Sequence, residues 1–91
     1  MLDVITIAEL WKTHFDGELP SHLFFGQWKK YDRSDLDTAF RISANWAARL
    51  ISRGENPTAL DVSKYASCVV RNLRKDRNEL EMIQQRQEPQ P

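Results

Sequence analysis

The stretch DLDTAFRISANWAARLISRG, residues 35–54, decides the fold of this chain. Its apolar and small residues recur every three or four positions, which is the period of an amphipathic α-helix. They are Leu36, Ala39, Phe40, Ser43, Ala47, Leu50 and Ile51. Gly54 follows the last of them, and glycine is the residue type that most readily ends a helix. The pattern therefore predicts a helix over residues 35–53, with Ser34 and Asp37 as its N-terminal cap.

Two shorter helices are predicted before this stretch. Thr6 and Glu9 have the spacing of a capping box, and the glycine of Asp16-Gly17 can end a helix, so the first helix is expected over residues 7–15. Ser21 can cap a second helix over residues 21–31. Its broad aromatic face favours core packing, although aromatic side chains can also stack on bases.

A fourth helix is predicted after the break at Pro57, because proline disfavours helical geometry in the residue before it. Thr58 or Asp61 can cap it, and its apolar pattern covers residues 59–77, with an extension to 86 as an alternative. The chain is thus expected to be all-α, a compact bundle of about four helices.

Length and composition indicate one domain. The chain has 91 residues, of which 41% are hydrophobic, enough for one core and too few for two. We expect a single helical domain over residues 1–83. Residues 84–91 consist mainly of Gln and Pro and are expected to form a disordered tail.

Charge and cysteine content narrow the class of protein. Thirteen basic residues balance thirteen acidic ones, so only local patches can attract a charged partner. A single cysteine, Cys68, excludes an internal disulfide, and the chain lacks the long apolar run of a membrane span. We therefore expect a cytoplasmic protein without a membrane partner.

The sequence offers little for catalysis. Its two histidines, His14 and His22, have no metal-ligand spacing, and Cys68 lies in an apolar helical stretch typical of inert thiols. Asp35 and Asp37 come at the start of a predicted helix, where carboxylates are favourable. We expect no enzyme, no metal and no cofactor.

The fourth helix carries the strongest functional signal. Basic residues crowd its C-terminal half, and one more precedes them: Lys64, Arg71, Arg74, Lys75 and Arg77. Such a stripe can bind the phosphates of nucleic acid. Alternatively, it complements the helix dipole or is merely solvated surface.

Residues 65–73, YASCVVRNL, resemble the YxxxIxxxW signature of DnaD-like replication domains, which occur in bacterial primosome proteins and phage replisome organisers. Tyr65 and Val69 match its first and fifth positions, whereas Leu73 replaces the Trp of the ninth. The similarity extends over about residues 24–78. It implies a helical domain that binds DNA, particularly single strands, and assists helicase loading, with Tyr65, Val69 and Arg71 as the positions carried over.

Two functions and one assembly are therefore expected. The first is a phage- or mobile-element-type accessory protein that binds single-stranded DNA or a replication protein through the fourth helix. The alternative is a small module that modulates a host protein complex through an exposed aromatic, Trp46 or Trp28. A homodimer through the fourth helix is a further alternative, because Leu73, Leu80 and Ile83 recur at coiled-coil-like intervals.

Overall fold

The computed structural model describes residues 2–17 and 19–87, and side chains only as far as residue 82. Four helices make up this part of the chain: α1 (Val4–His14), α2 (His22–Trp28), α3 (Arg33–Ser52) and α4 (Ala59–Gln87). No strand occurs among the described residues. The predicted all-α bundle is confirmed.

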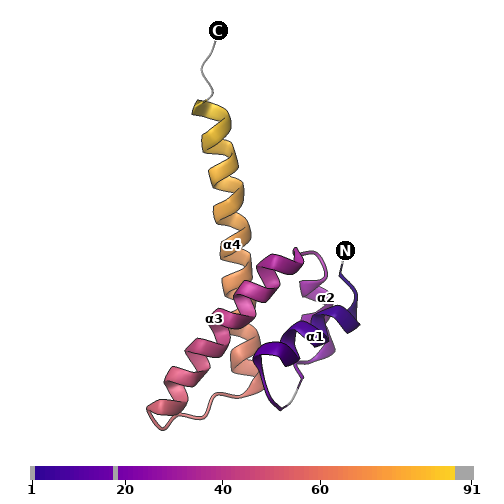
Figure 1. The fold of residues 1–91 in the computed structure, drawn as a ribbon, viewed down its shortest axis with the longest axis vertical. Helices are drawn as coiled ribbons and strands as arrows, with labels where there is room; N and C mark the ends of the chain where they lie inside the picture. The colour runs from indigo at the N-terminus through magenta and orange to yellow at the C-terminus, as the bar shows by residue number, and fades with distance from the viewer. Residues whose placement is uncertain (1, 18, 88–91) are drawn as a thin grey trace.

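The two long helices organise the molecule. α3 packs along the N-terminal half of α4, α1 packs on α3, and α2 contacts both α1 and α4. Beyond this bundle the C-terminal half of α4 continues on its own (Figure 1). The protein is therefore elongated, 58 × 32 × 19 Å, with a radius of gyration of 15.7 Å.

A cluster of aromatic rings forms the centre of the core. Trp11 of α1 and Trp28 of α2 stack with ring centroids 5.9 Å apart, and both meet Phe40 of α3 edge-on at 5.2 and 5.0 Å. All three are almost completely buried. One ring from each of three helices thus fixes how α1, α2 and α3 pack together.

The start of α1 corrects the predicted cap. Asp3, not Thr6, is the N-cap, and its Oδ1 accepts a 2.8 Å hydrogen bond from the Thr6 amide. This bond, chiefly from the Thr6 backbone, lowers the pKa of Asp3. The helix begins earlier than predicted because Leu2 packs against the core and its amide donates to the Lys29 carbonyl, which orders the chain before Asp3. Gly17 has φ 103°, as expected for the turn after the helix.

The boundaries between α2 and α3 also differ from the prediction in part. Ser21 is the N-cap of α2, as predicted, and accepts from the Leu23 amide at 3.3 Å. α2 ends at Trp28, three residues early, because the chain turns there and the Tyr31 amide bonds the Trp28 carbonyl. The predicted Ser34 cap is wrong: Asp32 holds the N-cap position of α3.

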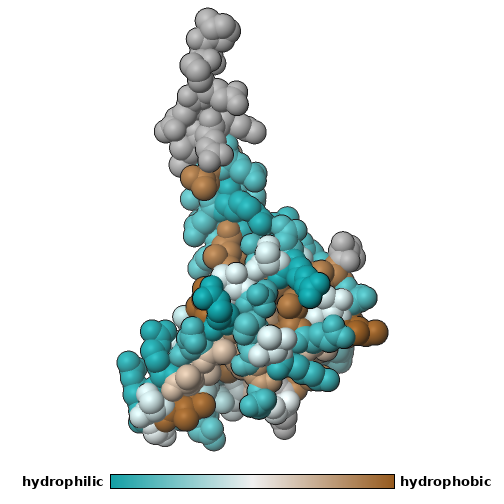
Figure 2. All heavy atoms as spheres, viewed as in Figure 1, coloured by the Kyte–Doolittle hydropathy of each residue, from teal (hydrophilic) through white to brown (hydrophobic). Residues whose placement is uncertain are grey.

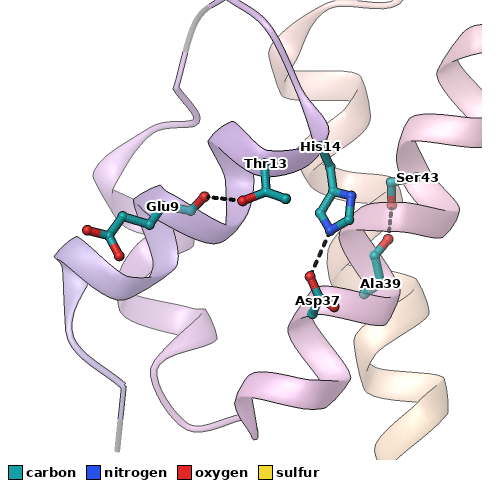
Figure 3. Close-up of polar contacts among 6 residues, drawn as sticks. All are labelled: Glu9, Thr13, His14, Asp37, Ala39 and Ser43. Atoms are coloured by element: carbon teal, nitrogen blue, oxygen red, sulfur yellow. Dashed lines mark hydrogen bonds and ion pairs between the residues drawn. The ribbon is translucent and has the colours of Figure 1, made fainter.

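The acidic residues at the start of α3 reach other helices. Asp37 Oδ1 lies 2.7 Å from His14 Nε2 of α1, and Figure 3 shows this contact bridging the two helices. Further along α3, the buried Ser43 hydroxyl donates to the Ala39 carbonyl at 2.7 Å, so its polarity is satisfied within the helix. The Asp37 carboxylate therefore holds α3 against α1, in addition to its favourable place near the start of a helix.

α4 begins with the predicted cap and ends later than predicted. The Thr58 amide donates to Asp61 Oδ2 and the Asp61 amide to Thr58 Oγ1, both at 3.1 Å. The hydrogen bond from the Thr58 backbone lowers the pKa of Asp61. α4 continues to Gln87, so residues 84–87 of the predicted tail are helical, while residues 88–91 lie outside the described residues.

Candidate nucleic-acid interface

Two segments distant in the sequence bring basic residues together. Arg71 and Arg74 of α4 face the connection between α2 and α3, where they meet Lys30 and Tyr31. Lys30 Nζ lies 5.3 Å and Arg74 Cζ 5.6 Å from the centroid of the Tyr31 ring. We call Lys30, Tyr31, Arg71 and Arg74 the basic cluster.

A hollow of about 270 Å³ lies inside the basic cluster. It is lined by Gln27, Trp28, Lys30, Tyr31, Ser67 and Arg71. Its inner wall is fixed by a hydrogen bond of 2.9 Å from Trp28 Nε1 to Ser67 Oγ. The hollow therefore presents cations, an amide and a hydroxyl, the groups that bind phosphate oxygens.

The cations of the basic cluster are not neutralised by carboxylates. Among residues 2–17 and 19–82, none of Lys30, Arg71 and Arg74 forms an ion pair. Asp32 and Glu81 do line an adjoining hollow of about 410 Å³, together with Lys30, Tyr31, Arg74, Arg77 and Asn78. Asp32 pairs with Arg77, so Glu81 is the one carboxylate of this hollow that forms no ion pair among the described side chains, against the two cations Lys30 and Arg74.

Arg77, predicted from the sequence to bind nucleic acid, is engaged in ion pairs with the start of α3. Its guanidinium lies 3.0 Å from Asp32 Oδ2 and 2.7 Å from Asp35 Oδ2, so α4 is fastened to the start of α3. Lys75 points outward and lies 4.0 Å from Glu79, with its side chain 71% exposed. Arg77 therefore stabilises the fold, and Lys75 contributes only surface charge.

The residues taken from the DnaD-like signature lie mostly inside the fold. Tyr65 stacks on Trp46 of α3, and Val69 packs against the core beside Leu73. Of the three positions carried over, only Arg71 is exposed. Tyr65 and Val69 thus pack α4 against the bundle, although the edge of Tyr65 remains accessible in a groove.

The two tryptophans proposed as protein contacts differ. Trp28 is 0% exposed and cannot anchor a partner, so that expectation is wrong: its ring fills the core. Trp46 is half-buried. With Tyr65, Leu50 and Pro57, Trp46 lines a groove of about 570 Å³ between α3 and α4, which also includes Glu55, Asn56, Asp61 and Lys64. We call this the aromatic groove.

The sequence pattern did not predict that Lys30 belongs to the candidate site, nor that Tyr31 lies between Lys30 and Arg74. The pair Lys29-Lys30 before Tyr31 was a local signal, but it lies about forty residues from Arg71 and only the packing of α2 on α4 joins them. Lys30 adds a second segment to a site that the sequence suggested for α4 alone.

The described residues were also compared with what a metal site and a membrane-spanning helix require. The described residues contain no group of three or more side chains placed to hold a metal ion. Within the same residues, no helix combines the length and hydropathy needed to cross a membrane. Figure 2 shows mostly hydrophilic side chains over the visible face of α3 and α4, with apolar residues in scattered patches.

Comparison of the chain with protein-family models, with curated proteins and with solved structures finds no match.

Proposed function

We propose that this protein binds single-stranded DNA through the basic cluster, as a non-catalytic accessory of replication in a phage or mobile element. The observation that carries the proposal is the gathering of Lys30, Arg71 and Arg74 around Tyr31, with none of these cations in an ion pair among the described side chains. Cations interleaved with an aromatic ring are the combination that single-strand binders use.

The physical basis is local, because the molecule has no net charge. Arg71, Arg74 and Lys30 each offer one charge to a phosphate, and each phosphate contact releases condensed counterions. Binding should therefore be moderate in strength and strongly dependent on salt. The replication context comes from the resemblance to DnaD-like domains, to which Arg71 contributes directly and Tyr65 and Val69 only by positioning α4.

Fluorescence anisotropy with a labelled single-stranded 20-mer, titrated at several salt concentrations, tests this proposal. The double variant R71A/R74A should bind about tenfold or more weakly at low salt. The slope of log K against log salt concentration should become shallower by about 1.4, since each phosphate contact on a single strand contributes about 0.7. Both side chains are exposed, so folding should be retained.

The matched control is R41A/R49A, which removes two exposed arginines from α3. Its affinity should stay within about twofold of the parent protein, since surface charge away from a contact changes binding little. No detectable binding at about 50 mM salt, where screening is weak, or an equal loss in both double variants, would contradict the proposal.

A protein-binding module remains the second candidate, and the projecting half of α4 favours it. Leu80 and Met82 are 56% and 53% exposed there. Arg74 and Lys75 precede them and Glu79 and Glu81 surround them, so an antiparallel copy of the same helix is complementary in charge. Leu80 and Met82 lie two positions apart and therefore on different faces of α4, so either of them can anchor a partner helix, including one from a second copy of this chain.

A further inference from the structure

We infer that the aromatic groove receives one unstacked base of the bound strand and favours bases that carry an amino group over thymine. The inference rests on the proposed function, because it assigns a second contact to the same single strand. It concerns a different part of the molecule, the junction of α3 with the start of α4.

The floor of the groove suits a flat ring. Trp46 and Tyr65 stack with centroids 4.3 Å apart and ring planes 3° from parallel, so each ring covers one face of the other and only an outer face of the pair can receive a base. Leu50 and Pro57 complete the apolar lining. A volume of about 570 Å³ lies within the range of small-molecule sites. Bases stack on such surfaces regardless of sequence, since every base has a π-face.

The rim of the groove supplies the preference among bases. Glu55 and Asp61 place two carboxylates there, next to the amide of Asn56. Asp61 Oδ2 already accepts a hydrogen bond from the Thr58 amide, which lowers the pKa of this carboxyl, so Glu55 is the carboxylate of the rim without such a capping bond. Carboxylates accept hydrogen bonds from the exocyclic amino groups of cytosine, adenine and guanine. Thymine has no amino group, and its single N3–H donor lies between two carbonyl oxygens that repel a carboxylate, so cytosine is favoured over thymine.

Lys64 connects the groove to the basic cluster. It lines the groove and precedes Arg71 by seven residues, two turns of α4, so the two cations lie on one face of the helix about 10 Å apart. A strand whose phosphates follow Lys64, Arg71 and Arg74 would therefore bring one of its bases to Trp46. This accounts for a cation at the rim of a groove otherwise edged by acids.

Anisotropy titrations with labelled (dC)15 and (dT)15 at low salt test the inference. The parent protein should bind (dC)15 about fivefold or more tightly than (dT)15, as expected for one good contact to a base edge. The variant E55Q should reduce that difference to within about twofold while leaving (dT)15 affinity unchanged. The control E79Q changes another exposed carboxylate and should keep the full preference.

A second measurement uses the free nucleotides. On titration with dCMP, the indole N–H signal of Trp46, identified with W46F, should shift more than those of buried Trp11 and Trp28, and dTMP should have a smaller effect. Equal binding of both oligonucleotides by the parent and by E55Q, with R71A/R74A still weakened, would overturn the groove and leave the proposed function standing. No binding of either oligonucleotide would overturn both.

Discussion

At the scale of single residues, the contact between Trp28 and Ser67 joins the core to the candidate site. The indole ring is fully buried, yet its Nε1 reaches across to the Ser67 hydroxyl of α4 at 2.9 Å. Ser67 also lines the hollow of the basic cluster. One hydrogen bond thus satisfies a core side chain and fixes the wall against which Lys30 and Arg71 lie.

Replacing Ser67 by Ala should lower the free energy of unfolding by about 1–2 kcal/mol, because the Trp28 N–H would lose its partner in a part-buried position. Urea denaturation measures this loss. The neighbouring exposed residue gives the control: C68A should change stability by less than about 0.5 kcal/mol. An unaltered stability of S67A would mean that Ser67 is not needed to satisfy the indole.

At the scale of elements, the two parts of α4 make different contacts with the rest of the molecule. Its N-terminal half packs on α3 through buried Val62, Ala66 and Val70. Its residues 74–82 are exposed except for Arg77, which meets Asp32 and Asp35. Since isolated helices of this length are marginal in water, that ion pair holds the direction in which the helix leaves the bundle.

The variant R77A should therefore lower the free energy of unfolding by about 1–2 kcal/mol, less than for a fully buried pair because Arg77 is 39% exposed. The cost arises because Asp35, only 15% exposed, would keep an uncompensated charge. K75A breaks an exposed pair on the same helix and should cost less than about 0.5 kcal/mol. Equal urea midpoints for R77A and the parent would count against this role.

At the scale of the whole molecule, the shape of the chain and the distribution of its charges describe its surface better than its length and its net charge. The radius of gyration, 15.7 Å, exceeds the roughly 12 Å of a compact chain of this length, because α4 projects from the bundle. Likewise the net charge is zero while the basic cluster is locally positive. The projecting part of α4 leaves Leu80 and Met82 exposed to solvent.

Sedimentation velocity over a range of concentrations tests self-association. The parent protein should shift from 10.7 kDa toward twice that mass as concentration rises, whereas L80E/M82E should stay monomeric with unchanged helical content. Leu73 is not expected to join this seam, since it packs against the core. A parent protein that stays at 10.7 kDa throughout would remove the dimer from consideration.

The sequence by itself determined the four helices and several of their ends. The apolar period of residues 35–53, the cap at Ser21 and the Thr58–Asp61 pair all rest on neighbours within a few positions, so the local pattern suffices. It also predicted Arg71 and Arg74 as nucleic-acid contacts, because a run of cations in one helix can be read from the sequence alone.

Only the tertiary structure decided which of those side chains are free to act. Arg77 is taken up by two carboxylates from α3, and Trp28 is enclosed by rings from α1 and α3. Lys30 joins Arg71, and Trp46 meets Tyr65, across segments far apart in the chain. The physical reason is that burial and ion pairing depend on packing between helices, which the period within one helix does not encode.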